Sequence, residues 1–313
     1  MRHRTAAVFL CIVLTCATAA AGCAGGQSRT DGGAELHLVS GGLTRTYILH
    51  VPPSYDGSRP YPLVIAYHGH GGDGAGQERV SGMDATADAN GFLVAYPNGI
   101  SKGWNDGRSS GDTSVDDVGF TSDLIARISS TYSVDASRVF ATGLSNGGMM
   151  CYRIAMDLHD QVAAVAPVAA LLSQYLAGRT PNPRPISVMV TAGTNDPLMP
   201  YNGGAVGLVL KTRGNVLSAA DTISFWTKAD ACNPTPATTS INKDPNDGTS
   251  VKVDDYTGGT NGAEVMLYTV DGGGHAWPGG VQYARPRLIG VTSRDYSASQ
   301  AIWDFFARHT LGR

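Results

Sequence analysis

The sequence lacks an excess of positive charge. Its 313 residues include 23 lysines and arginines against 26 aspartates and glutamates, a formal net charge of −3. No basic run occurs beyond the N-terminus, so the chain has no electrostatic footprint for a nucleic acid or another anionic polymer. Charged residues make up 16% of the chain and hydrophobic residues 42%. That balance supports a packed core and argues against wholesale disorder.

The sequence also lacks a hydrophobic run long enough to span a bilayer. The apolar run at residues 6–14 follows a basic segment at residues 2–4 and precedes a stretch of small residues. This order is that of a secretory signal. We therefore expect residues 1–23 to be a signal peptide and the mature protein to work outside the cytoplasm, in the extracellular space or at the cell surface.

The end of this signal allows two kinds of processing. Residues 20–23, Ala-Ala-Gly-Cys, resemble a bacterial lipoprotein signal, in which cleavage leaves the cysteine as a lipid-bearing N-terminus. Cys23 is therefore the candidate lipidation site, and a lipid there is the only membrane contact that we expect. Ordinary cleavage near Ala21 would instead release a freely secreted protein. Residues 24–34 are Gly- and Ser-containing and are expected to form a flexible tether.

Cysteine is scarce in the part of the chain that is expected to fold. Of the five cysteines, three lie in or beside the signal, which leaves Cys151 and Cys232. An exported pair permits a disulfide but does not establish one. Cys151 falls on an expected helix, where a small buried hydrophobic residue is the simpler interpretation.

Apolar runs of strand length alternate with helical patterns through the rest of the chain. Strands are expected within 36–51 (two strands joined at Gly41-Gly42), 62–67, 92–96, 139–142, 162–168, 186–191 and 264–270. Helices are expected at 78–90, 120–132, 219–231 and 298–309, with long loops at 97–115 and 233–250. The alternation predicts one α/β domain over residues 35–313, with a mostly parallel central sheet and helices on both faces.

Residues 143–147 match Gly-x-Ser-x-Gly, a sharp strand-to-helix turn that exposes a nucleophilic serine. A strand is expected before the motif and a helix after it, which is the context that the motif requires. Gly143 and Gly147 flank a cramped turn in which a Cβ atom would clash. Ser145 is therefore the candidate nucleophile.

Asp196 and His275 each follow an expected strand, where catalytic groups collect in such sheets. With Ser145 they occur in the order serine, acid, histidine. The imidazole of His275 can remove the serine proton near neutral pH, and Asp196 would hold the imidazole in the required tautomer. Asp271 and Asp254 are the alternative acids, although Asp271 lies only four residues from the histidine.

A serine hydrolase also needs two backbone N–H groups to bind the oxyanion. The first is expected from Asn146, the residue after the nucleophile, and the second from His70 in the loop after the strand at 62–67. His68-Gly69-His70 has the His-x-His spacing of some zinc hydrolases, but Asp73 falls one place too late to continue that motif. A calcium loop at 244–248 is too compressed. We expect no metal and no cofactor.

Taken in order, several motifs resemble the polyhydroxybutyrate depolymerase and feruloyl esterase group, which includes carbohydrate esterase family 1 and LpqC-like lipoprotein esterases. The matching motifs span roughly residues 35–310 and are Tyr67-His68-Gly69, Trp104-Asn105, residues 116–120, residues 143–149, Asp196 and residues 272–279. The resemblance implies an α/β-hydrolase fold and a serine esterase that carries its triad on Ser145, Asp196 and His275. One departure is that many relatives pair a cysteine at the Cys232 position with one where this chain has Gly259.

The resemblance leaves the ester open. Relatives act on feruloyl or acetyl groups of plant xylans and on hydroxybutyrate polymers or oligomers. Trp104 and Trp277 are candidates for stacking on an aromatic acid or a sugar ring. An equally good interpretation of Trp277 is that it packs beneath the His275 loop and positions it. The chain has no separate substrate-binding domain or Thr-rich linker, which favours small or soluble esters over solid polymer.

These observations predict an exported serine esterase that acts through an acyl-enzyme intermediate on small-molecule or polysaccharide esters. One alternative is a peptidase of the same fold, although no acidic pair or arginine cluster in the sequence marks a site for a peptide terminus. The other is a non-catalytic glycan-binding surface lipoprotein, against which the retention of all three triad candidates argues.

Overall fold

The computed structural model describes residues 34–108, 114–179, 184–207 and 213–312. The expected signal peptide at 1–23, its Cys23 and all but the last residue of the tether lie outside the described residues. Among the residues that the structure describes, none of the helices combines the length and the apolar character that crossing a membrane requires.

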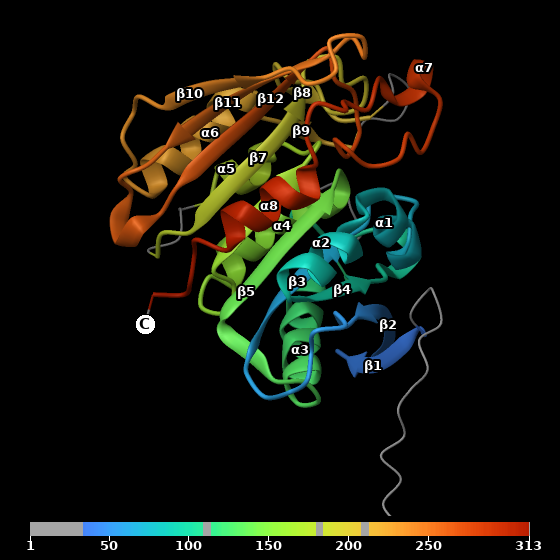
Figure 1. Ribbon diagram of the computed structural model, residues 1–313. Coiled ribbons are helices and arrows are strands. Elements are labelled where there is room, and N and C mark those ends of the chain that lie inside the picture. The colour runs from blue at the N-terminus through green and yellow to red at the C-terminus, as the bar shows by residue number, and fades with distance from the viewer. Residues whose placement is uncertain (1–33, 109–113, 180–183, 208–212, 313) are drawn as a thin grey trace, which may run out of the picture. The chain divides into compact units, whose positions relative to one another are not determined.

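A ten-stranded sheet organises the described chain (Figure 1). In spatial order its strands are β1 (Leu36–Ser40), β2 (Leu43–His50), β4 (Leu93–Pro97), β3 (Tyr61–Tyr67), β5 (Val134–Leu144), β6 (Ala164–Val168), β7 (Ser187–Gly193), β12 (Val265–Asp271), β11 (Ser250–Tyr256) and β10 (Ala237–Ile241). The six strands from β4 to β12 are parallel, and two antiparallel strands flank them at each edge. A separate short pair joins β8 (Gly204–Ala205) to β9 (Asn215–Val216). The predicted α/β-hydrolase architecture is confirmed.

Helices cover both faces of this sheet (Figure 1). They are α1 (Gly74–Ser81), α2 (Met83–Asn90), α3 (Asp117–Ser129), α4 (Asn146–Asp157), α5 (Gln174–Ala177), α6 (Ala219–Ala229), α7 (Pro286–Ile289) and α8 (Ala298–Phe306), with 3₁₀ turns η1 (Ile100–Lys102) and η2 (Thr260–Gly262). The core that contains residues of α3, α4 and α6 takes in Leu63, Ile65 and Tyr67 of β3. The core that contains residues of α1, α2 and α8 takes in Val64 and Ala66 of the same strand. Because β3 is packed on both faces, its sequence is a continuous apolar run.

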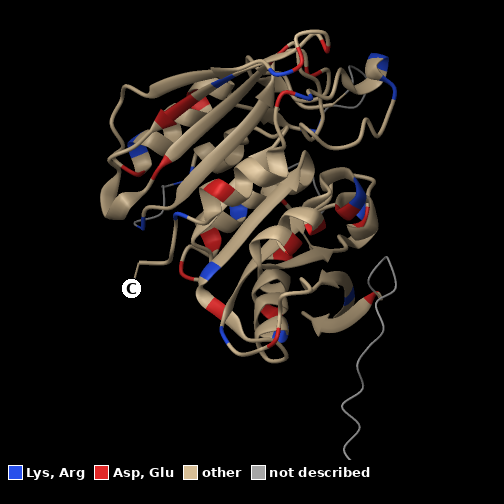
Figure 2. Cartoon of the chain, viewed as in Figure 1, with Lys and Arg blue, Asp and Glu red and all other residues tan. Residues whose placement is uncertain are grey.

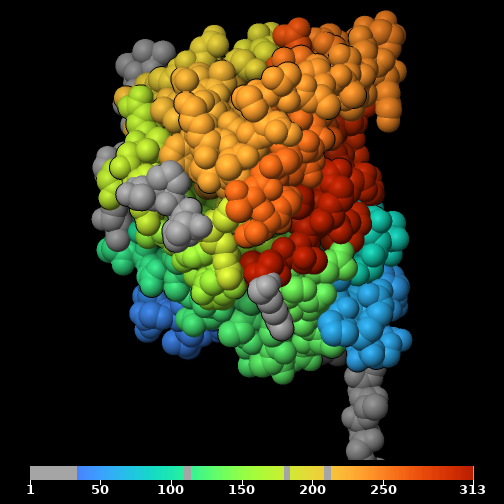
Figure 3. Space-filling view, turned by 90° about the vertical axis from the view of Figure 1, so that its left-hand side faces the viewer, coloured from blue at the N-terminus to red at the C-terminus, as the bar shows by residue number. Residues whose placement is uncertain are grey.

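The C-terminal helix joins segments that are far apart in the sequence. In Figure 3 the C-terminal segment, in red, lies between orange residues of the second half of the chain and green and cyan residues of the first half. The Trp303 ring stacks on Phe92 with centroids 4.1 Å apart, and the Phe306 ring stacks on Phe140 at 4.6 Å. Such aromatic pairs add about 0.5–1.5 kcal/mol each beyond the area they bury.

Two predicted segments differ from the structure. The helix expected at 78–90 is two helices, because Gly82 adopts a left-handed conformation (φ 58°) and its N–H group donates to the Glu78 carbonyl, which ends α1. The loop expected at 233–250 contains β10 and the first residue of β11. Residues 237–240 of β10 are exposed, and an edge strand of this kind carries no apolar alternation that a sequence could reveal.

Both cysteines of the described chain are free. Cys151 is buried on α4, and its thiol donates to the Gly147 carbonyl at 3.3 Å. Cys232 is half-buried, and burial raises its thiol pKa to about 11. A Cβ atom added at Gly259 would lie 2.8 Å from the Cys232 sulfur. The chain therefore retains the proximity of these two positions that the resemblance implied, with one thiol in place of a disulfide.

The carboxyl group of Asp230, at the C-terminal end of α6, is buried. Its Oδ1 atom accepts from the Ile186 amide at 3.2 Å, and its Oδ2 atom has no hydrogen-bond partner among the described residues. Burial raises the pKa of this carboxyl to about 7. An unfolded aspartate titrates near pH 4, so between about pH 4 and pH 7 the folded state keeps a proton that the unfolded state has released. The free energy of unfolding must therefore fall as pH rises through this window.

Asp230→Asn is expected to remove this pH dependence. Each unit of pKa difference corresponds to roughly 1.4 kcal/mol, so the wild type should lose about 2–3 kcal/mol of Asp230-linked stability between pH 5 and pH 8, a loss that the variant should be spared. Urea denaturation of both proteins at the two pH values measures the difference. An equal change in the free energy of unfolding for both proteins would show that Asp230 is not the responsible group.

Candidate active site

The three triad candidates follow the carboxyl ends of strands in the parallel part of the sheet. Ser145 follows β5, Asp196 lies beyond β7, and His275 lies beyond β12. Because β7 and β12 are neighbours and only β6 separates β5 from β7, the three residues are brought to the same edge of the sheet, as expected for this class of fold.

Ser145 occupies a strained turn between β5 and α4. Its backbone has φ 59° and ψ −118°, a conformation that a residue with a side chain rarely adopts. The surrounding hydrogen bonds hold it there: the Ser145 amide donates to the Val168 carbonyl at 2.9 Å, and its own carbonyl accepts from Met149 at 2.8 Å. A Cβ atom on Gly147 would overlap the Tyr67 carbonyl oxygen. The glycine therefore allows the turn to pack directly against the end of β3.

His275 and Asp196 form a buried pair. The imidazole Nδ1 atom lies 2.7 Å from the Asp196 Oδ2 atom. The other carboxylate oxygen, Oδ1, accepts from the amides of Leu198 and Met199, each at 2.8 Å. Because these two N–H groups fix the carboxylate, Oδ2 is held as the acceptor for an Nδ1–H group. The Nε2 atom of His275 is then left unprotonated, which is the form that can act as a base.

The two alternative acids are engaged elsewhere. Asp271 is exposed and accepts from the Thr194 hydroxyl at 3.0 Å. Asp254 pairs with Lys252 at 2.8 Å and accepts from the Thr238 hydroxyl at 2.7 Å. Of the three acids weighed from the sequence, the structure brings only Asp196 to His275.

Neither of the two backbone amides expected to bind the oxyanion has a hydrogen-bond acceptor among the residues that the structure describes. Asn146 is the first residue of α4, where an amide has no intrahelical acceptor and lies at the positive end of the helix dipole. No acceptor for the His70 amide occurs among the described residues. The Asn146 side chain is already engaged: its Oδ1 atom accepts from the Trp104 amide at 2.8 Å, and its Nδ2 atom donates to Asp106 at 2.5 Å.

His68, the other histidine of this loop, is satisfied by the backbone. Its Nδ1 atom lies 2.8 Å from the Gly69 carbonyl, and its Nε2 atom accepts from the Gly99 amide at 2.9 Å. Burial lowers the pKa of His68, which favours the neutral ring. The described residues contain no group of three or more His, Cys, Asp or Glu side chains placed to hold a metal ion.

Ser145 and His275 open onto one cavity of about 560 Å³. Its wall includes the loop at 68–73, part of α1, Asn146, Leu198, Tyr283 and Ile289, and three arginines, Arg79, Arg108 and Arg213. The Tyr283 hydroxyl also donates to the His275 carbonyl at 2.8 Å. Tyr283 therefore links the rim of the cavity to the segment that carries the histidine. In the view of Figure 2, charges of both signs are interspersed over the described part of the chain.

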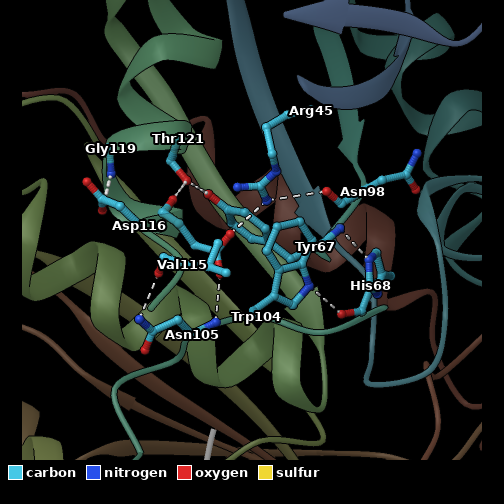
Figure 4. Close-up of polar contacts among 12 residues, drawn as sticks. Arg45, Tyr67, His68, Asn98, Trp104, Asn105, Val115, Asp116, Gly119 and Thr121 are labelled. Carbon is cyan, nitrogen blue, oxygen red and sulfur yellow. Dashed lines mark hydrogen bonds and ion pairs between the residues drawn. The ribbon is translucent and has the colours of Figure 1, made fainter. Parts of the chain in front are cut away.

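The two tryptophans proposed to contact substrate differ in position. Trp104 is buried and lines a hollow of about 220 Å³ next to the main cavity. Figure 4 shows its ring beside Tyr67 and His68, and its indole N–H group donates to the His68 carbonyl at 2.8 Å. Trp277 is 0% exposed, lies outside the cavity wall and donates to the Ser299 hydroxyl at 3.0 Å. The expectation that Trp277 stacks on substrate is therefore corrected, because its ring is fully covered by the protein.

Figure 4 shows a buried network around Arg45, Trp104 and Asn105 that the sequence did not predict. Arg45 of β2 donates to the Asp117 Oδ1 atom at 2.7 Å, and the Asp117 Oδ2 atom accepts from the Asn105 amide at 2.7 Å. Burial raises the pKa of Asp117, while the Asn105 amide and the Arg45 guanidinium oppose that shift. The network fixes the segment at 104–106 that holds the Asn146 side chain. Trp104 was expected to contact substrate, whereas the motifs that contain Asn105, Asp116 and Asp117 suggested no role for those three residues.

Several proteins similar to this chain in sequence are named as esterases. No family model matches the chain. The chain is 33% identical over 280 residues to a putative esterase, NocK, of Nocardia uniformis subsp. tsuyamanensis, which covers 86% of this chain and 80% of that protein. It is 31% identical to feruloyl esterase B of Piromyces equi (74% of this chain, 42% of that protein) and 28% identical to a probable feruloyl esterase C of Aspergillus niger (87% and 86%).

Solved structures agree on the fold. A thermostable esterase superposes with a TM-score of 0.52 at 14% identity, over 90% of this chain and 63% of that one. The acetyl xylan esterase from Aspergillus awamori superposes with a TM-score of 0.51 at 16% identity, over 76% and 93%. At these identities the likeness supports the α/β-hydrolase fold.

Proposed function

Because the chain belongs to the feruloyl esterase group and is an esterase, we propose that it hydrolyses feruloyl, acetyl or hydroxybutyrate esters as a serine enzyme, through an acyl-enzyme intermediate. The observation that carries this proposal is the buried His275–Asp196 pair, with 2.7 Å between Nδ1 and Oδ2, beside a cavity that Ser145 also lines. A serine hydroxyl is a weak nucleophile until a positioned base takes its proton.

In the first half-reaction, the Ser145 Oγ atom attacks the ester carbonyl carbon while His275 Nε2 accepts the hydroxyl proton. The carbonyl oxygen becomes negatively charged and is stabilised by the amides of Asn146 and His70. His275 then gives its proton to the departing alcohol oxygen as the carbon–oxygen bond breaks, which leaves the acyl group on Ser145. Asp196 stabilises the imidazolium throughout and stays ionised.

In the second half-reaction, water takes the place of the alcohol. His275 removes a proton from this water as its oxygen attacks the acyl carbon, and then returns the proton to Ser145 Oγ as the acyl–enzyme bond breaks. The products are the carboxylic acid and the regenerated serine. The same two amides bind the oxyanion in both halves, so one preorganised site serves both transition states.

A panel of four esters tests this function: p-nitrophenyl acetate, methyl ferulate, acetylated xylan and a hydroxybutyrate oligomer, with Ser145→Ala as the blank. We expect turnover of at least one ester by the wild type and none above background by the variant, and the preferred ester then identifies the substrate class. A matched p-nitroanilide should be a far poorer substrate, since comparable amide turnover would favour a peptidase. A wild-type enzyme that is inert on all four esters would contradict the proposal.

A further inference from the structure

The wall of the cavity on the Asn146 side is unusually basic. Arg108 and Arg213 line both the main cavity and the adjoining hollow, together with His70 and Asn146. His275 lines the main cavity but not the hollow. The two arginines therefore line the same part of the cavity as the groups expected to bind the oxyanion.

Arg108 is neutralised within the protein. Its Nε atom lies 3.0 Å from both carboxylate oxygens of Asp106, and its Nη2 atom lies 2.6 Å from Oδ2. Its Nη1 atom donates to the backbone carbonyl of Arg213 at 2.8 Å. Since Asp106 is also bound by the Asn146 side chain, this chain of contacts ties the backbone of Arg213 to the start of α4. Arg108 therefore acts as a support for Arg213.

Arg213, by contrast, is not neutralised by a carboxylate of any residue that the structure describes. Its side chain makes no ion pair with any residue that the structure describes, and it is half-buried in the cavity wall. Its amide donates to the Val206 carbonyl at 2.9 Å, which fixes its backbone further. Asp106 is committed to Arg108. Asp73, on the loop side of the cavity, caps the N-terminus of α1 by accepting from Gly76 at 2.9 Å.

The arginine charges on this wall also affect the pKa of His70. Burial lowers the pKa of His70, and the charges of Arg213 and Arg108 lower it further. Both arginines line the cavity together with His70, and the lowered pKa favours the neutral imidazole. A neutral ring leaves Arg213 as the group on this wall that can attract an anion.

We propose that Arg213 binds a carboxylate carried on the acyl chain of the ester, so that an ester with a free acid group on its acyl chain is hydrolysed faster than the same ester without that charge. This inference rests on the proposed esterase function. His275, which protonates the departing alcohol, lines the main cavity but not the hollow, whereas Arg213 lines both. An acyl chain that extends from Ser145 toward the hollow therefore reaches Arg213, while the alcohol lies on the side of His275. A guanidinium matches the two oxygens of a carboxylate in a bidentate pair, which gives orientation as well as affinity.

The test compares two substrates that differ only in this charge: the mono-4-nitrophenyl ester of adipic acid and the same compound with its free acid capped as a methyl ester. The readout is the ratio of kcat/KM for the acid over the capped ester, measured on the full-length protein. A hydrogen-bonded contact to a charged group corresponds to a preference of roughly tenfold or more. We expect the wild-type ratio to exceed about ten and to fall as sodium chloride screens the charge.

Arg213→Gln should lower this ratio about tenfold, while Arg213→Lys, which keeps the charge but loses the planar fork, should retain part of it. Arg294→Gln is the matched control, because Arg294 is an exposed arginine outside both cavities, and its loss should leave the ratio unchanged. A wild-type ratio near one, a ratio that salt does not alter, or the same ratio in Arg213→Gln would overturn the inference while the esterase function stands. No hydrolysis of either compound or of p-nitrophenyl acetate would overturn both.

Discussion

Ser145→Ala is expected to lower kcat by about 10⁶ on every ester that the wild type hydrolyses, because the serine, its base and the acid act as one unit. The Oγ atom is the nucleophile of the first half-reaction, so no acyl-enzyme forms without it. Without it His275 has no proton to accept, and only the oxyanion amides and substrate binding remain. Those leave a residual acceleration of about 10³–10⁴ over water.

The substitution should leave the fold intact, because the turn at Ser145 is held by backbone hydrogen bonds to Val168 and Met149, and an alanine keeps both. Far-UV circular dichroism and the melting temperature check this. Ser130→Ala provides a matched control, since Ser130 is an exposed serine at the end of α3, and it should keep wild-type kcat. A loss of less than tenfold in a folded Ser145→Ala protein would show that another group is the nucleophile.

Asp196→Asn is expected to lower kcat by about 10⁴ while the protein keeps its shape. The amides of Leu198 and Met199 both donate to Oδ1, so an asparagine must place its oxygen there. Its NH₂ group then faces His275 Nδ1 in place of the carboxylate oxygen. Because an NH₂ group donates, Nδ1 must become the acceptor and the ring proton moves to Nε2. In that tautomer His275 cannot take the Ser145 proton.

Asp271→Asn is the matched control for this prediction. Asp271 is an exposed acid four residues before His275, and its known contact is with the Thr194 hydroxyl. We expect wild-type kcat/KM from this variant at all pH values. If Asp271→Asn loses as much activity as Asp196→Asn, or if Asp196→Asn keeps more than a tenth of wild-type kcat, then the assignment of the acid is incorrect.

The parallel sheet was predictable because its signals are local. Strands such as β3 are buried on both faces and appear as continuous apolar runs. Ser145, Asp196 and His275 could be proposed because each follows such a run, and parallel strands bring their carboxyl ends to one edge. The sequence left two roles open for Trp277, stacking on substrate or packing beneath the His275 loop. The burial of its ring in the structure distinguishes them, and burial of a single side chain cannot be predicted from a residue pattern.

Other parts of the site depend on contacts between distant segments. The support of Arg213 by Arg108 spans 105 residues, and the pair of Arg45 with Asp117 spans 72. None of these three arginines lies in a motif, so the sequence could indicate no role for them. The same limit applies to β10, which is a strand because it pairs with β11 and not because its own residues alternate.

Labelling with a fluorophosphonate tests the central claim most directly. If Ser145 is the activated nucleophile, its Oγ atom attacks the phosphorus, fluoride leaves, and His275 takes the hydroxyl proton, which yields a stable phosphonyl ester. Mass spectrometry of peptides from the labelled protein should then find one phosphonyl group per chain, on Ser145, in proportion to the activity lost. Complete inactivation with Ser145 unmodified, or a label on a different residue, would contradict the account.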